Sequence, residues 1–275
     1  MNQLEYVPGT FGADTIGMDG GGSFVGTAEG LRSREWAYEL GYRSIESATR
    51  PAREVDIAFQ TDYETADKLR RAADADVAAR TPGTFIAEGE WKQTGYIVSA
   101  QPSYIHFGRV GQTLQAVLLD GAWWRLVSRS FFIDQGEAVG GWLDYPHDYA
   151  YDYEAPTIEN TITPSVLTPS DVRLVIFGAV NNPYVIVGSN RYQINVNVPA
   201  GGYLIVDGRE KTITLVLSDG TRQNAFQYGV RANGQGGGTY IFEPIQGGEQ
   251  NVQWLGTFAF DLGWYEEEGE PPWSL

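Results

Sequence analysis

The chain has 275 residues, a mass of 30.3 kDa and a formal net charge of −16, from 19 basic and 35 acidic side chains. It has no cysteine, which excludes disulfides, thiol nucleophiles and thiolate metal sites. The excess of acid argues against nucleic-acid binding, because phosphate contacts need clustered lysine and arginine. The apolar runs are strand-sized, below the ~20 residues of a membrane span, and no secretory signal is predicted at the N-terminus.

The composition favours antiparallel β structure. Glycine accounts for 34 residues and aromatic side chains for 13% of the chain, a combination typical of strands joined by tight hairpins. The opening stretch, up to about Gly30, contains the run Asp-Gly-Gly-Gly-Ser at 19–23. We predict a loop or arm there.

The first half is predicted to be a sheet with one helix packed on it. Val55, Ile57 and Phe59 alternate with polar residues, which is the period of a half-buried strand. Further apolar and β-branched runs follow the helix. They predict strands at residues 84–86, 94–98, 104–107 and 113–119.

The helix is predicted to begin at Thr61 and Asp62, where Thr61 and Glu64 have the spacing of a capping box. It is predicted to end before Pro82. Apolar residues at helical spacing predict the buried face: Ala66, Leu69, Ala73 and Val77. Charged residues are assigned to the other faces: Lys68, Arg70, Arg71, Asp74 and Asp76.

A shift in composition predicts a linker over residues 134–156, which hold six acidic residues and four tyrosines but no lysine or arginine. Buried tyrosine rings would keep such a linker ordered. We place the domain boundary here, giving domains 1–140 and 141–275.

Three aspartates in the linker allow an alternative interpretation. Asp144, Asp148 and Asp152 recur every four residues, and carboxylate oxygens are the ligands that calcium prefers. The stretch lacks the spacing of an EF-hand, and Pro146 disfavours a continuous helix. A packed linker is favoured, and no metal ligand is assigned.

The second half is predicted to be an antiparallel sandwich. Residues 191–198 alternate apolar and polar side chains, and further strands are predicted at 203–206 and 212–217. The pairs Asp207-Gly208 and Asp219-Gly220 indicate tight hairpins, because glycine supplies a positive φ there. Short strands at this spacing are typical of a sandwich.

Motifs for catalysis are absent from the sequence. There is no Gly-Lys pair for a phosphate-binding loop and no Gly-x-Ser-x-Gly nucleophile elbow. Of the two histidines, His106 is interpreted as a structural strand residue, and His147 lies in the linker. The acidic run 266–270 is interpreted as a solvated tail. We therefore assign no catalytic, cofactor-binding or metal-binding residue.

Read in chain order, several segments together resemble one protein family. They are Asp-Tyr-Pro-His-Asp-Tyr at 144–149, Phe-Gly-Ala-Val-Asn-Asn-Pro at 177–183, Gly-Tyr-Leu-Ile-Val-Asp at 202–207, Lys-Thr-Ile at 211–213, Gly-Gly-Glu-Gln-Asn-Val-Gln-Trp at 247–254, Phe-Ala-Phe-Asp-Leu at 258–262 and Glu-Pro-Pro-Trp at 270–273. In this order the chain resembles the distal tail proteins (Dit family) of long-tailed, siphovirus-like phages and prophages.

The resemblance implies a mainly β fold in two parts. Domain 1–140 would be a β-rich belt with one helix that forms a ring, usually a hexamer. Domain 141–275 would be a galectin-like β-sandwich, or jelly roll, with a returning C-terminal tail. From the residues themselves, the stiff pair Pro271-Pro272 predicts that Trp273 packs back onto the protein.

The resemblance also implies a structural role in the virion, with assembly in the host cytoplasm. The ring would connect the distal end of the tail tube to the baseplate hub or tail fibre. The implied partners are further copies of the chain, the tail tube protein, the hub or fibre protein, and the tape measure protein. No enzymatic activity, cofactor, nucleic acid or membrane insertion is implied.

Two other functions stay open from the residues alone. The first is a carbohydrate-binding adhesion module, in which tryptophans stack on sugar rings, although packing is the commoner fate of tryptophan. The second, weaker alternative is a glycoside hydrolase using paired carboxylates. The tryptophans considered are Trp91, Trp123, Trp124, Trp142, Trp254, Trp264 and Trp273.

Overall fold

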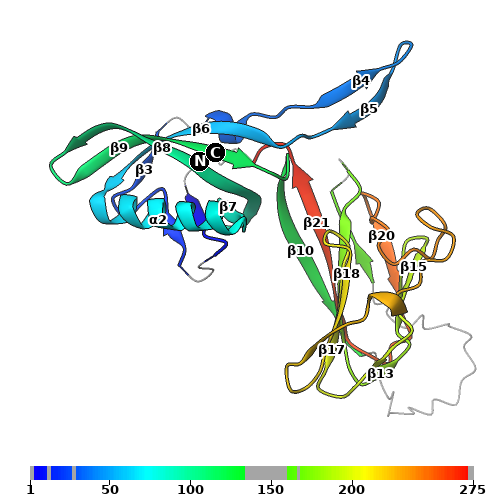
Figure 1. The fold of residues 1–275 in the computed structure, drawn as a ribbon. Helices are drawn as coiled ribbons and strands as arrows, with labels where there is room; N and C mark the ends of the chain where they lie inside the picture. The colour runs from blue at the N-terminus through cyan, green and yellow to red at the C-terminus, as the bar shows by residue number, and fades with distance from the viewer. Residues whose placement is uncertain (1–2, 11–13, 27–28, 134–159, 166–167, 272–275) are drawn as a thin grey trace, which may run out of the picture. The chain divides into compact units, whose positions relative to one another are not determined.

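A computed structural model describes residues 3–10, 14–26, 29–133, 160–165 and 168–271. The chain divides into two compact units (Figure 1). Unit 1 comprises residues 1–125 and 267–275, and unit 2 comprises residues 126–266. The predicted boundary at 140/141 lies outside the described residues.

Unit 1 is an antiparallel sheet with helices and an additional hairpin. Its elements are β1 (Leu4–Val7), β2 (Ile16–Gly17), β3 (Phe24–Val25), α1 (Glu29–Arg32), β4 (Ala37–Leu40), β5 (Ile45–Thr49), β6 (Arg53–Asp62), α2 (Tyr63–Ala79), β7 (Gly83–Ala87), β8 (Trp91–His106), β9 (Arg109–Leu118) and the first residues of β10 (Trp123–Phe131). The sheet order is β2-β1-β7-β8-β9-β6-β3. β4 and β5 form a two-stranded sheet of their own.

The first-half strands agree with the prediction except for their continuity. The residues predicted as two strands, 94–98 and 104–107, belong to the single strand β8, which continues with register shifts between Ile97 and Ser99 and between Pro102 and Tyr104. β-Bulges of this kind bend a long strand without ending it. On β6, Val55, Ile57 and Phe59 are buried, as the alternation predicts.

The opening stretch is not a simple loop or arm. Leu4 and Tyr6 in β1 are fully buried, and β1 pairs with β7 along its length. The Asp-Gly-Gly-Gly-Ser run is a turn, closed by reciprocal backbone hydrogen bonds between Gly20 and Ser23. The prediction for this stretch was therefore wrong, because strand pairing with a distant segment leaves little trace in a four-residue sequence.

Helix α2 begins at the second of the two residues predicted to cap it. Asp62 is the N-cap, and its Oδ1 accepts a 2.8 Å hydrogen bond from the Thr65 amide. This bond holds the pKa of Asp62 below its usual value. Thr61 is buried in β6, where its hydroxyl is 2.8 Å from that of Ser23, so the proposed capping box with Glu64 does not form.

The buried face of α2 is also rotated from the predicted one. Leu69, Ala72, Ala73 and Asp76 are buried, whereas Val77 is 44% exposed. The placement of Asp76 on a solvent face was thus wrong. A carboxyl group is tolerated here because the N-terminal segment supplies hydrogen-bond donors to it.

Unit 2 is a sandwich of antiparallel sheets. Its elements are the remainder of β10, then β11 (Thr161–Ile162), β12 (Asp171–Phe177), β13 (Val180–Asn181), β14 (Tyr184–Val187), β15 (Asn190–Gln193), β16 (Asn197–Val198), β17 (Tyr203–Asp207), β18 (Thr212–Val216), β19 (Arg222–Asn224), η1 (Phe226–Tyr228), β20 (Gln250–Gln253) and β21 (Phe260–Glu268). Within the unit one sheet has the order β19-β18-β17-β12-β21-β10, and another has the order β11-β20-β14-β15.

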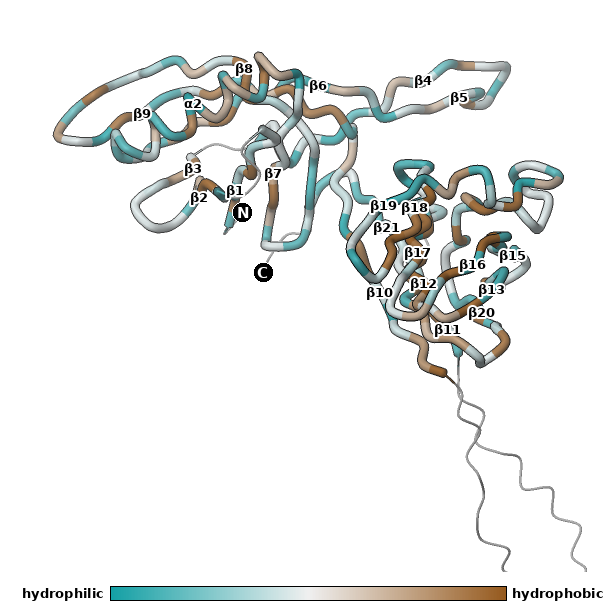
Figure 2. Tube along the Cα trace, turned by 60° about the horizontal axis from the view of Figure 1, so that its bottom comes forward, coloured by the Kyte–Doolittle hydropathy of each residue, from teal (hydrophilic) through white to brown (hydrophobic). Residues whose placement is uncertain are grey.

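The core of unit 2 is formed by alternate residues of both sheets. Leu174 and Ile176 on β12 and Val185 on β14 are fully buried. Figure 2 shows the hydrophobic, brown segments along β17, β18 and β21. The fold is therefore mainly β, as predicted.

One predicted strand of unit 2 is divided. In the segment 191–198, β15 ends at Gln193, Ile194 forms a bridge with Gly229, and β16 begins at Asn197. The alternation of burial continues across the break. A period of two therefore marks which face is buried but does not show where a strand changes partner.

The two Asp-Gly hairpins differ. Gly220 has φ +84°, as the pattern predicts. In the β17–β18 turn the residue in the left-handed conformation is Lys211, with φ +52°. The Asp207 carboxylate accepts hydrogen bonds from the backbone amides of Arg209 and Glu210. Gly208 is needed for close approach, because a Cβ there would lie 2.8 Å from the Val172 carbonyl oxygen.

Candidate functional site

The predicted linker cannot be assessed as a metal site. Asp144, Asp148, Asp152 and His147 all lie outside the described residues. Among the residues that the structure describes, no group of three or more acidic or histidine side chains is placed to hold a metal ion. The assignment of no metal ligand stays a prediction.

His106 ends β8, so it is a strand residue as expected, but its side chain is exposed. Its ring contacts that of Phe107, with centroids 3.9 Å apart. The residue lies at the tip of the β8–β9 hairpin, where Phe107 is 90% exposed.

The acidic run near the C-terminus is partly structured. Glu266, Glu267 and Glu268 belong to β21, and the Glu266 carboxylate accepts a 3.1 Å hydrogen bond from the Trp264 indole. Further on, Pro271 is buried and its carbonyl accepts a 3.1 Å hydrogen bond from Arg32. The tail is therefore not simply solvated up to residue 271, while Trp273 lies outside the described residues.

Three of the six described tryptophans are buried packing residues. Trp91, Trp123 and Trp264 are buried, and the Trp123 indole donates a 3.0 Å hydrogen bond to the Leu31 carbonyl. These three side chains are not available to stack on a sugar. These three tryptophans therefore do not support the alternative of a carbohydrate-binding module.

One polar side chain lies deep in unit 1. Asp76 is fully buried, and its carboxyl oxygens accept hydrogen bonds from the Tyr6 hydroxyl (2.7 Å), the Gly9 amide (3.1 Å) and the Thr10 amide (2.7 Å). All three donors come from the N-terminal segment. These three hydrogen bonds therefore hold the N-terminal segment against α2. We call this group the Asp76 cluster.

The strongest pKa shifts concern tyrosines and are caused by burial. Burial raises the pKa of Tyr6, Tyr192 and Tyr265 above the ordinary value, and hydrogen bonds to Asp76 and Asp207 raise it further for Tyr6 and Tyr265. These phenols therefore stay protonated at neutral pH. Nothing in this pattern activates a nucleophile or base.

One exposed segment of unit 1 is the β4–β5 hairpin, residues 34–50, which we call the arm. Every residue of both strands is exposed. Figure 1 shows the arm reaching away from the rest of unit 1. Trp36 lies at its base, with the Arg50 guanidinium 4.5 Å from its ring centre.

The arm has one apolar face and one polar face. Tyr38 pairs with Ala48 and Leu40 pairs with Ile45; directly paired residues project from the same side of a sheet. On the opposite face the Ser47 hydroxyl donates a 3.1 Å hydrogen bond to Glu39. The apolar face is uncovered, with Leu40 73% exposed.

A second surface feature lies between α2 and the strands β8 and β9. It is a hollow of about 230 Å³, which we call the α2 hollow. Val98, the extra residue of the first bulge in β8, is 46% exposed beside it. The lining residues include Ala66, Leu69, Ala73, Ile97, Ala100 and Leu114, with Arg70 and Asp74 among the polar ones.

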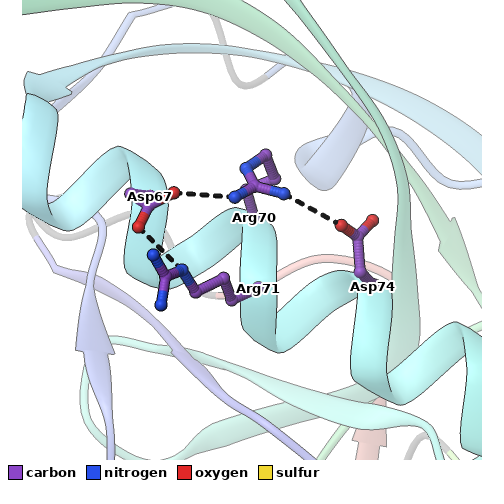
Figure 3. Close-up of polar contacts among 4 residues, drawn as sticks. All are labelled: Asp67, Arg70, Arg71 and Asp74. Carbon is purple, nitrogen blue, oxygen red and sulfur yellow. Dashed lines mark hydrogen bonds and ion pairs between the residues drawn. The ribbon is translucent and has the colours of Figure 1, made fainter.

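Four charged side chains along the outside of α2 are paired with one another (Figure 3). Arg70 is 2.7 Å from Asp67 and 3.3 Å from Asp74, and Arg71 is 2.8 Å from Asp67. The hydrogen bond from Arg70 lowers the pKa of Asp67. The four side chains together carry no net charge.

Within the described residues, no helix is long and apolar enough to cross a membrane. No protein-family model matches the chain. No curated protein is detectably similar to it in sequence.

Solved structures do resemble it. A chain from the structure of the phage P2 baseplate in its activated conformation with Ca aligns with a TM-score of 0.58 at 10% identity, covering 98% of this chain and 99% of that one. The P2 baseplate with Sr gives a TM-score of 0.56 at 11% identity, covering 98% and 99%. The SPP1 Dit (gp 19.1) protein, titled a paradigm of the hub adsorption apparatus in phages that infect Gram-positive hosts, gives 0.53 at 11% identity, covering 96% and 99%.

These matches extend over nearly the whole of each chain. The protein therefore has the fold of phage baseplate proteins, and in particular a Dit-like fold. The resemblance predicted from the order of the sequence segments is confirmed at the level of the fold.

Sequence reasoning missed two surface features of unit 1, the arm and the α2 hollow. A local pattern could have predicted a strand in the arm, because the large apolar residues Tyr38 and Leu40 stand at alternate positions just before Gly41. No local sequence pattern predicts the α2 hollow. It depends on a bulge in β8 and on small side chains of α2, which meet only in the folded unit.

Proposed function

We propose that the protein is a structural, non-enzymatic component of a phage tail. In this proposal its N-terminal unit forms a hexameric ring at the distal end of the tail tube. The observation that carries the proposal is the Dit-like fold over nearly the whole chain. The exposed arm adds independent support, because its uncovered apolar face calls for a protein partner.

The proposed neighbours follow the same assignment. The ring would contact further copies of the chain, the tail tube protein on one side and the baseplate hub or tail fibre protein on the other, with the tape measure protein as an additional partner. The protein would act in the virion after assembly in the host cytoplasm. It would need no cofactor, because assembly is a matter of surface contact.

Light scattering after size exclusion tests the ring. A hexamer of 30.3 kDa chains has a mass of about 182 kDa. We expect this species either for the purified chain or after addition of the tail tube protein, and cryo-EM images should show six-fold rings. Monomers under all of these conditions would contradict the proposal.

A further inference from the structure

A hollow in unit 2 has the size of a ligand-binding site. It lies along the β18–β19 hairpin, at the end of the larger sheet of this unit (Figure 2), and we call it the β19 hollow. Its volume is about 400 Å³, within the ~300–1,000 Å³ of small-molecule sites. Its polar lining comprises Lys211, Thr212, Thr214, Arg222, Gln223 and Asn224.

The charge of the β19 hollow is opposite to that of the chain. Lys211 and Arg222 line it, and no acidic side chain does. The Lys211 ammonium is 3.3 Å from Asp171, whereas the exposed Arg222 guanidinium forms no hydrogen bond or ion pair with any described residue. In a chain of net charge −16, such a hollow attracts anions locally.

The neutral polar side chains of the hollow suit a ligand with hydroxyl groups. Thr214 and Asn224 are directly paired across the two strands, so they project from the same side of the sheet. The Asn224 Oδ1 accepts a 2.9 Å hydrogen bond from the Phe226 amide, which leaves the NH2 group of Asn224 to donate. Threonine hydroxyls can both donate and accept. A polyol therefore matches this lining better than a bare inorganic anion does.

Phe226 adds an apolar wall to the hollow. Its ring is 42% exposed. It stacks with the buried Phe242 at a centroid distance of 5.9 Å, and the Arg231 guanidinium is 4.0 Å from its centre. These contacts hold the ring in place, so the C–H groups of a sugar or polyol can pack against it. Arg231 is also a third cation close to the hollow.

We propose that the β19 hollow binds an anionic polyhydroxy polymer, meaning a glycan or polyol chain that bears carboxylate or phosphate groups. Lys211 and Arg222 would bind the acidic groups through charge-assisted hydrogen bonds, and Thr214 and Asn224 would bind hydroxyls. Duplex DNA carries one charge per ~1.7 Å of its axis, which three cations cannot neutralise. A polymer with one acidic group per repeat fits them better. This binding goes beyond the proposed ring and does not depend on it.

Isothermal titration of the full-length chain with defined polymers tests the proposal. The probes are polygalacturonate, which bears carboxylates, and poly(glycerol phosphate), which bears phosphates. Neutral dextran and polyglutamate are the controls for hydroxyls without charge and for charge without hydroxyls. We expect binding of at least one of the two anionic polyols, weaker at high salt because of screening, and no binding of either control. The polyol that binds identifies the acidic group.

Matched variants locate the binding. Arg222→Gln and Lys211→Gln should each weaken it about tenfold or more, because each removes a charge-assisted hydrogen bond. Thr214→Val removes one hydroxyl with little change of shape and should weaken binding less. Lys68→Gln changes the net charge by the same amount in unit 1, at a side chain that is 48% exposed, and should leave binding unchanged.

The outcomes separate this site from the proposed ring. Binding of an anionic polyol that falls in Arg222→Gln and Lys211→Gln but not in Lys68→Gln supports the site. Equal binding of dextran or polyglutamate, an equal loss in Lys68→Gln, or no binding of any polymer overturns it. The ring is scored independently by light scattering, so each of these results leaves the proposed function standing.

Discussion

The Tyr6 hydroxyl donates a 2.7 Å hydrogen bond to Asp76, so a residue of the first strand is held by one seventy positions later on α2. The Gly9 and Thr10 amides bind the same carboxyl group. A buried acid thus serves as a common acceptor for the N-terminal segment. Its value is structural, because the Tyr6 hydroxyl would otherwise be buried without a partner.

We expect Asp76→Ala to lower the free energy of unfolding by about 2–3 kcal/mol, because it leaves the buried Tyr6 hydroxyl unpaired and removes two hydrogen bonds to less buried amides. Tyr6→Phe removes one donor and should cost about 1–2 kcal/mol. Urea unfolding measures both. Asp74→Ala, on the exposed side of the same helix, is the control and should change the urea midpoint little. An equal loss of stability in Asp74→Ala would contradict the structural role of the Asp76 hydrogen bonds.

Alkaline pH should destabilise the protein through its buried tyrosines. Burial raises the pKa of Tyr6, Tyr192 and Tyr265 in the folded state, whereas unfolded tyrosines ionise near pH ~10. Their contribution to stability is therefore complete below that pH and is lost as the pH rises above it. We expect a lower urea midpoint at pH ~11 than at pH ~9.

The variants Tyr265→Phe and Tyr42→Phe identify the source of this loss. Tyr265 donates its hydroxyl to Asp207 and is buried, whereas Tyr42 is 88% exposed. The pH-dependent loss should shrink in Tyr265→Phe and stay unchanged in Tyr42→Phe. An equal loss in both variants would assign the effect to another group.

The β10 strand should be essential to unit 2. Phe131 is buried and stacks on Phe260 with ring centroids 4.8 Å apart, and its edge faces Trp254. Phe131→Ala should cost about 3–5 kcal/mol. Of two isolated fragments, 126–266 should unfold cooperatively and 160–266 should not, as monitored by circular dichroism. Equal stability of the two fragments would count against the contribution of β10.

Removal of the C-terminal tail should destabilise unit 1. Truncation after Gly269 removes Pro271, the buried acceptor of the Arg32 hydrogen bond, together with Trp273, which we predict to pack onto the protein. We expect a lower melting temperature by calorimetry. Truncation after Pro271 separates the two contributions, since it keeps the acceptor and removes only the last four residues.

Ring assembly should depend on ionic strength. Each chain carries −16, so copies repel one another where screening is weak, and the Debye length falls to ~8 Å at physiological salt. We expect more of the ring species at physiological salt than at low salt, by light scattering. A ring that dissociates as salt rises would indicate that attraction between opposite charges holds it together.

The parts of the fold that the sequence could predict are those with a local periodic pattern. Val55, Ile57 and Phe59 alternate over a strand that is buried on one face, and the helix ends near its predicted residues. Asp76 shows the limit of such patterns. Its burial depends on donors from β1 and the residues after it, which are distant in sequence.

The candidate surfaces were less predictable for a similar reason. The arm residues Tyr38 and Leu40 look like those of an ordinary strand, and only the folded unit shows that nothing in the described chain covers them. The α2 hollow depends on Val98 leaving the regular register of β8. Neither exposure nor a bulge follows from side-chain type alone.

The chain leaves unit 1 at Arg125/Leu126 and re-enters it at Glu266/Glu267, through the neighbouring strands β10 and β21. Unit 2 is thus an insertion within unit 1 and not an appendage at one end. Any domain whose first and last strands are neighbours could be grafted at these two junctions while unit 1 keeps its fold. Exchange of the inserted domain would then change the surface that the protein exposes, while the fold of unit 1 stays the same.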